Sequence, residues 1–120
     1  MGLVWVAVPN VAAAVKQSER LGFAPGADRQ LAALGGRGRE VACGSGSIVF
    51  WEPAKDTSRL GSLIKIYGLG PFGVSVEVSD LQKAHRIVEL GTQSKLPIDR
   101  NSFVVPGDLA GGTWIEFVQQ

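Results

Sequence analysis

VSVEVSDLQKAHRIVELG, at Val74–Gly91, is a near-repeat of VWVAVPNVAAAVKQSERLG at Val4–Gly22. The two stretches align at an offset of 70 residues, which brings Asn10 onto Asp80, and the offset slips to 69 by the final glycine. Each copy has valines at alternate positions, as in a strand with one apolar face, and then an Asn or Asp of the kind that caps helices. A helical pattern of apolar residues follows and ends at a glycine, which favours the C′ position of a helix. Each copy therefore predicts a strand followed by a helix.

A second pair of similar stretches lies further along the chain. SIVFWE at Ser47–Glu52 aligns with WIEFVQ at Trp114–Gln119 at an offset of 67 residues. Both are typical of strands. Shorter strands are predicted at Arg29–Leu34 and Arg39–Cys43 in the first copy, with a turn between them at Gly35–Gly38 after a turn at Phe23–Gly26. In the second copy they are predicted at Phe103–Val105 and, more weakly because of Pro97, within Thr92–Asn101. Val104–Thr113, which is rich in glycine, is interpreted as a turn before the last strand rather than a phosphate-binding loop.

The repeat predicts one α+β domain made of tandem βαβββ modules. The first module spans residues 1–53 and the second spans 72–120, and 54–71 form a connector with a short apolar patch at Leu63–Ile66. The connector is too long for a plain loop, so part of it should pack.

The composition excludes several function classes. A net charge of +1 gives no electrostatic basis for binding nucleic acid or anionic lipid. No apolar stretch reaches the length of a membrane span, and no secretory leader pattern opens the chain. Cys43, the single cysteine, cannot form an internal disulfide, which fits a reducing compartment. We expect a cytoplasmic protein that has no nucleic-acid or membrane partner.

The modular pattern resembles the vicinal oxygen chelate superfamily, which contains the glyoxalase I, bleomycin-resistance and extradiol dioxygenase families. The resemblance rests on VWVAVPNVAAAV, on VSVEVSDLQKA and on the closing AGGTWIEFVQ, and it covers nearly the whole chain. It implies a curved mixed sheet around a concave groove, with the helices outside. It also implies a homodimer, with modules paired within a chain or exchanged between two chains.

Strand alternation indicates which side chains face the groove. In each copy, the alternating valines of the strand before the helix are expected to pack beneath that helix. The residues between these valines then face the opposite way. This places all three tryptophans and two glutamates on the groove face, a composition suited to a flat or apolar ligand. Alternatively, the tryptophans fill a closed core. The predicted ligand-binding residues are Trp5, Trp51, Trp114, Leu3, Val49, Ser75, Glu77 and Glu116.

The resemblance also implies where a metal ion would bind. Metal-using members place His, Gln or Glu at four positions, which correspond here to Leu3, Val49, Gly73 and Glu116. Only Glu116 has a donor atom, and one carboxylate does not hold a transition ion. We therefore expect no metal and no other cofactor, although a divalent ion held weakly near Glu77 and Glu116 remains an alternative. His85 is interpreted as a partly buried or solvated helix residue.

Glu116 and Glu77 are the candidate catalytic residues, as a carboxylate pair for acid–base chemistry. The alternative is a glutamate held in an ion pair or hydrogen bond, with Arg39 or Arg100 as partner. Cys43 is interpreted as a small buried hydrophobe rather than a nucleophile.

Three functions remain open. The main hypothesis is a metal-free, bleomycin-resistance-like protein that binds a small aromatic or apolar ligand in a tryptophan-lined groove, without catalysis. The alternative is a glyoxalase-like lyase, epimerase or isomerase that uses Glu116 as its base, with or without a weakly bound divalent metal. The third is a structural or partner-binding module whose groove is filled by its own side chains. The sequence does not identify the ligand.

Overall fold

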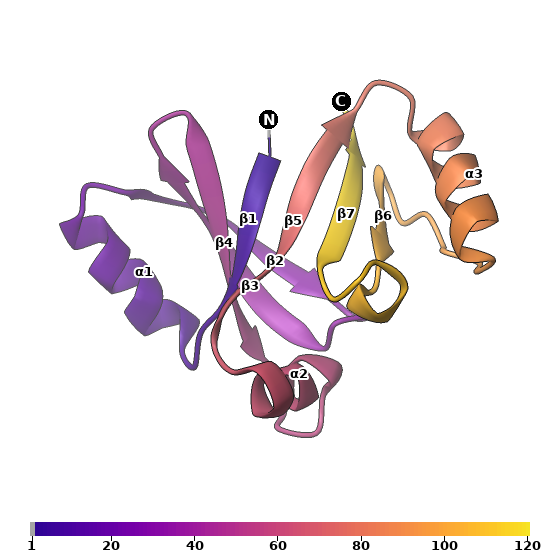
Figure 1. Ribbon diagram of the computed structural model, residues 1–120. Helices are drawn as coiled ribbons and strands as arrows, with labels where there is room; N and C mark the ends of the chain where they lie inside the picture. Colours follow the sequence, from indigo (N-terminus) through magenta and orange to yellow (C-terminus); the bar gives the residue numbers. More distant parts are fainter. Residues whose placement is uncertain (1) are drawn as a thin grey trace. The chain divides into compact units, whose positions relative to one another are not determined.

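The structure is a computed structural model that describes residues 2–120. It divides into two compact units, of which the first spans Val4–Pro71 and the second comprises Gly2, Leu3 and Phe72–Gln120. Both units combine strands with helices (Figure 1), so the predicted α+β class is confirmed. Within residues 2–120 no helix is long and apolar enough to cross a lipid bilayer.

The first unit contains most of the first module and the connector. Its elements are β1 (Gly2–Ala7, shared with the second unit), α1 (Val11–Arg20), β2 (Ala24–Leu31), β3 (Gly36–Cys43), β4 (Gly46–Pro53) and α2 (Arg59–Tyr67). The strands lie in the order β2-β3-β4-β1, and the β2–β3 and β3–β4 pairs are antiparallel. Helix α2 lies within the expected connector.

The ends of α1 follow from its terminal residues. The Asn10 side chain accepts a hydrogen bond from the Ala13 N–H at 2.9 Å, as expected of an N-cap. Gly22 follows the helix with φ of 88°, a conformation that glycine adopts without steric cost. Both predicted end signals are confirmed.

The buried face of α1 packs against β3 and β4. Val11 and Val15 contact the buried Val41, with Val8, Phe23 and Phe50 around them. The helical spacing of apolar residues in the sequence predicts that Leu21 joins this face with Val11 and Val15, and this prediction is wrong. Leu21 is the C-cap residue, where the helix has ended, and its side chain is 74% exposed.

The predicted boundaries of β2 are also wrong, because the strand begins at Ala24 and ends at Leu31. The expected turn at Phe23–Gly26 therefore lies partly inside it. β2 is the end strand of the order given above and its side chains are mostly exposed, so no alternating apolar pattern marks it. Backbone pairing with β3 fixes its position, with a bulge between Pro25 and Asp28.

The predicted turn at Gly35–Gly38 is mostly strand, since β3 begins at Gly36. Gly35 lies in the turn before β3 with φ of 68°, whereas Gly36 and Gly38 are needed for close packing. A Cβ atom on Gly38 would lie 2.8 Å from the ring of Trp51, its partner on β4, and one on Gly36 would lie 2.9 Å from a methyl group of Leu60.

The second unit contains the second module. Its elements are β5 (Gly70–Val78), α3 (Leu81–Thr92), β6 (Ser102–Val105), the short 3₁₀ helix η1 (Gly107–Leu109) and β7 (Trp114–Gln119). The strand order is β5-β7-β6, with β5 and β7 parallel and β6 and β7 antiparallel. This module has three strands rather than four. In place of the strand expected within Thr92–Asn101 there is a single bridge between Asp99 and Ser102.

Side chains of α3 replace that strand. His85 Nε2 lies 2.6 Å from the carbonyl oxygen of Leu96, and the Leu96 N–H donates to Glu89 Oε2 at 2.6 Å. Leu96 is buried in a core with Leu81, Phe103 and Val105. The backbone groups that a strand would pair are thus satisfied by a helix, and His85 is partly buried, as expected.

Two further predictions are corrected. Gly91 does not end α3, because the helix continues to Thr92 and Gln93 adopts the left-handed cap conformation with φ of 55°. The alternating valines are not all covered by helices, since Val4 is 43% and Val76 is 39% exposed. In each unit the helix packs over neighbouring strands, and the core beneath it includes the last valine of the series, Val8 or Val78.

Candidate functional site

The face of the first unit opposite α1 carries three fully buried apolar side chains. We call Trp5, Val49 and Trp51 the apolar cluster; each has 0% of its surface exposed. Their position agrees with strand alternation, because Phe50, between two of them, packs on the side of α1. The rings of Trp5 and Trp51 are tilted by 57° with their centroids 5.4 Å apart, a favourable aromatic geometry.

Trp51 is enclosed on several sides. The ring lies against Gly38, and the Arg29 guanidinium carbon is 5.7 Å from the ring centroid. Its Nε1 is buried, with less than 1 Å² of exposed surface, and has no hydrogen-bond partner among the described residues. So little exposed surface leaves no space for a water molecule beside this nitrogen. These indoles therefore pack as core residues in this structure, and ligand binding by Trp5, Val49 and Trp51 stays a prediction.

The corresponding face of the second unit is polar. Parallel pairing of β5 with β7 brings Ser75 opposite Glu116. The Ser75 hydroxyl donates a hydrogen bond to Glu116 Oε1 at 2.8 Å, and the two residues are only 3% and 2% exposed. We call them the polar pair. Burying a carboxylate is costly unless hydrogen bonds compensate, so the Ser75 hydroxyl both stabilises and orients Glu116.

Trp114 lies two residues before Glu116 on the same face of β7 and is 2% exposed. A Cβ atom on Gly107 would lie 3.0 Å from Trp114 Cδ1 and 3.1 Å from Nε1, so the loop before β7 covers this indole. Leu3 is half-buried near the start of β1. Its neighbour Gly2 runs close to the backbone of Ser75, since a Cβ atom there would lie 3.1 Å from the Ser75 carbonyl oxygen.

The structure places the other carboxylate candidate at the surface. Glu77 is exposed and lies opposite Val118 in the register of β5 and β7, two residues beyond Ser75 on the same side of the strand. A pairing of Glu77 with Glu116 stays a prediction. Arg39, one of the two expected ion-pair partners, forms its ion pair with Asp28 at 3.8 Å.

The residues at the four positions that the family resemblance implies for a metal do not fit one. Leu3, Val49 and Gly73 offer no donor atom, and Glu116 already accepts a hydrogen bond from Ser75. Among residues 2–120 no three His, Cys, Asp or Glu side chains gather into a group.

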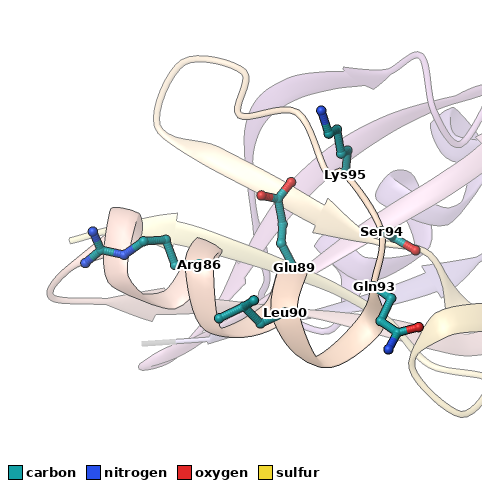
Figure 2. Close-up of a pocket in the computed structure, with 6 residues that line it drawn as sticks. All are labelled: Arg86, Glu89, Leu90, Gln93, Ser94 and Lys95. Atoms are coloured by element: carbon teal, nitrogen blue, oxygen red, sulfur yellow. The ribbon is translucent and has the colours of Figure 1, made fainter.

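A surface hollow of about 470 Å³ lies along the end of α3, away from these candidates. Figure 2 shows that Arg86, Gln93 and Lys95 point to different sides of it rather than toward one centre. Glu89, also in the hollow, is already bonded to the backbone of Leu96. The lining residues are Arg86, Glu89, Leu90, Gln93, Ser94 and Lys95.

The Ser75–Glu116 bond was not predicted, although both residues were. The repeat itself contains a signal for it. At the offsets of 70 and 67 residues, Ser75 aligns with Trp5 and Glu116 aligns with Val49, so two polar residues replace two residues of the apolar cluster. Adjacent polar replacements on one face indicate a buried polar site.

Comparisons with known proteins address the fold. No family model matches the sequence, and no curated protein matches it. Among solved structures, methylmalonyl-CoA epimerase from Mycobacterium tuberculosis has a TM-score of 0.77 at 21% identity, covering 98% of this chain and 85% of that one.

Two ligand complexes are similar to the chain. A methylmalonyl-CoA epimerase in complex with methylmalonyl-CoA and NH4+ has a TM-score of 0.78 at 14% identity, covering 98% of this chain and 92% of that one. A variant of the Streptomyces coelicolor epimerase in complex with 2-nitronate-propionyl-CoA has a TM-score of 0.77 at 16% identity, covering 98% and 94%. These epimerases belong to the vicinal oxygen chelate superfamily. The chain therefore has the glyoxalase-like α+β fold of that superfamily.

Proposed function

We propose that the chain is an epimerase or isomerase that moves a proton at the carbon next to a carbonyl group, and that its substrate is a small acyl-CoA thioester. Two observations support this. The chain shares its fold with methylmalonyl-CoA epimerases, one of them bound to methylmalonyl-CoA. Its second module carries a carboxylate, Glu116, that is only 2% exposed and accepts a hydrogen bond from Ser75.

The buried polar pair is the observation that carries the proposal. A valine like Val49 would fill the position of Glu116 at no electrostatic cost, whereas a buried carboxylate has to be compensated. The 2.8 Å bond from Ser75 fixes the carboxylate in one orientation. A fixed carboxylate on a strand is a good general base, because it holds its oxygen in a defined place relative to the carbon that loses a proton.

The proposed reaction has two proton transfers. A carboxylate oxygen of Glu116 takes the proton from the carbon next to the carbonyl, and the electron pair of the broken C–H bond moves to the carbonyl oxygen as an enolate. A proton then returns to the opposite face of the planar carbon and the configuration inverts. We assign this return to Glu77 in its protonated form, which lies about 7 Å along β5 from Ser75 on the same side. Exchange with water then reprotonates Glu77 and removes the proton from Glu116, so both groups regain their starting states.

A second candidate is the binding protein without catalysis. The apolar cluster favours it, because Trp5 and Trp51 provide a large aromatic surface for a flat ligand if it becomes accessible. In that case Glu116 would be an anchor and no proton would be exchanged.

Deuterium incorporation separates the two candidates. Methylmalonyl-CoA is incubated with the protein in D₂O, and loss of the proton next to the carbonyl is followed by NMR. We expect catalysed exchange, reduced by about 100-fold or more in Glu116→Gln, since general bases contribute that much or more to rate. Glu40→Gln, which changes a carboxylate of the first unit that pairs with Arg29, is the matched control and should keep full activity.

Each outcome has a consequence. If Glu116→Gln exchanges as fast as the unmodified protein, Glu116 is not the base. If the unmodified protein binds methylmalonyl-CoA and exchanges no proton, the binding function replaces the epimerase. If neither binding nor exchange occurs, the acyl-CoA substrate class is wrong.

A further inference from the structure

The polar pair is closed to solvent in this structure. Ser75 and Glu116 are 3% and 2% exposed, and Trp114 beside them is 2% exposed. A base has to come within hydrogen-bond reach of the proton that it removes. A segment of the protein must therefore move before substrate reaches Glu116.

The segment Pro106–Thr113 lies next to the polar pair. It forms the turn that contains η1 and leads directly into β7 (Figure 1). Gly107 rests on the indole of Trp114, where an added Cβ atom would lie 3.0 Å from the ring. Trp114 in turn is two residues from Glu116 on the same face of the strand. This segment therefore covers one end of the polar site.

The segment is closed by its own hydrogen bonds. Leu109 and Gly112 donate to Pro106 and Gly107, at 3.0 and 2.7 Å, and Ala110 donates to Gly107 at 3.1 Å. The bonds from Leu109 and Ala110 persist if Pro106–Ala110 moves as one body, whereas the bond from Gly112 spans Gly111 and breaks when the segment turns there. Ala110 is the residue of this segment that packs on the core formed by Leu81, Leu96, Phe103 and Val105.

The segment joins β7 through two glycines in unusual backbone conformations. Gly111 has φ of 71° and Gly112 has φ of 100°. No atom outside the neighbouring residues would contact a Cβ at either position. The glycines are thus not required for close packing, and their wide conformational range suits a hinge.

We propose that Pro106–Thr113 is a lid that turns about Gly111 and Gly112, lifts Gly107 from Trp114 and admits the substrate to Glu116. This inference rests on the proposed function, because it assigns the lid to the access route of the proposed base. When the lid is closed, Trp114 and Gly107 exclude water from the carboxylate.

Fluorine NMR tests the motion without substrate. The three tryptophans are labelled as 5-fluorotryptophan, and the resonance that disappears in Trp114→Phe is that of Trp114. Relaxation dispersion reports exchange on the microsecond-to-millisecond timescale of lid opening. We expect an exchange contribution at Trp114 that is absent from Trp5 and Trp51.

Restricting the hinge should remove that contribution. Asn tolerates the left-handed backbone of Gly111 over a narrower range than glycine, so Gly111→Asn should suppress the exchange at Trp114. Gly44, with φ of 66° and no atom within 4 Å of an added Cβ, is a matched position in the first unit. Gly44→Asn should leave the Trp114 resonance unchanged.

The lid is refuted if Trp114 shows no more exchange than Trp5 and Trp51, or if Gly111→Asn leaves the exchange as large as Gly44→Asn does. Failure of the proposed function looks different. The lid would then move in the NMR experiment, while Glu116→Gln would not change deuterium incorporation.

Discussion

In the first module the Glu52 side chain, at the end of β4, accepts a hydrogen bond from the Val11 N–H at 3.1 Å. In the second module the Gln119 side chain, at the end of β7, accepts one from the Leu81 N–H at 2.9 Å. The offsets of the repeat bring these four residues onto one another in pairs. Both modules therefore satisfy the first backbone amide of their helix with a side chain from their last strand.

The faces opposite the helices differ. The first module buries two tryptophans and a valine there, whereas the second buries a hydroxyl and a carboxylate at positions equivalent to two of them. The comparison teaches that the repeated backbone and its caps tolerate either interior. The proposed proton transfer belongs to the second module, which has polar residues on this face. The paired residues are Trp5 with Ser75 and Val49 with Glu116.

Removing the largest member of the apolar cluster should have the largest effect. Trp51→Ala should lower the free energy of unfolding by about 3–5 kcal/mol, because it leaves a cavity among Trp5, Gly38 and Arg29. Urea unfolding monitored by circular dichroism measures this. A loss below about 1 kcal/mol would show that the cluster is not a packed core.

The glycine beneath that ring should be the next most sensitive position. Gly38→Ala should cost about 1–3 kcal/mol of unfolding free energy, because the new methyl group would lie 2.8 Å from the Trp51 ring. Gly46→Ala is the control, since an added Cβ there meets only the Cys43 carbonyl oxygen at 4.0 Å. Equal effects of the two substitutions would contradict the close packing.

The polar pair can be converted toward the composition of the first module. Ser75→Ala alone should cost about 1–3 kcal/mol, because it takes a hydrogen bond from a buried carboxylate. Adding Glu116→Val should recover most of that loss while deuterium exchange disappears. Thermal unfolding measures the stability of both variants, and the deuterium assay measures the loss of exchange. A double variant less stable than Ser75→Ala would show that Glu116 is mainly structural.

The helix caps should give the smallest effects, and similar ones in both modules. Glu52→Ala and Gln119→Ala should each cost about 0.5–2 kcal/mol of unfolding free energy. Gln119→Glu sharpens the comparison. It keeps the acceptor for Leu81 but loses the amide donor that binds the Ser79 carbonyl oxygen at 2.9 Å. An unfolding free energy equal to that of the unmodified protein would mean that the donor adds nothing.

The repeat made much of the fold predictable. Valine alternation, Asn10 and Asp80 as caps, and the final strands all follow from residue patterns that local structure obeys. β2 was misplaced because its side chains are exposed and its position depends on pairing with β3. The missing strand of the second module could not be predicted from its own residues, since side chains of the preceding helix, His85 and Glu89, make its hydrogen bonds.

The candidate site was predictable in its residues but not in its contacts. Alternation placed Glu116 and Ser75 on one face of their strands. Their hydrogen bond depends on the parallel register of β5 and β7, which no single strand specifies. The full burial of the tryptophans depends in the same way on packing between elements.

The two caps at Glu52 and Gln119 also bear on the ancestry of the chain. Each hydrogen bond closes within its own module, from the last strand back to the first turn of the helix. If the repeat arose by duplication of a single module, that module would already have had this hydrogen bond between its last strand and its helix. Duplication would then have required no new helix cap. The two copies differ instead on the opposite face, which carries Trp5 and Val49 in the first module and Ser75 and Glu116 in the second.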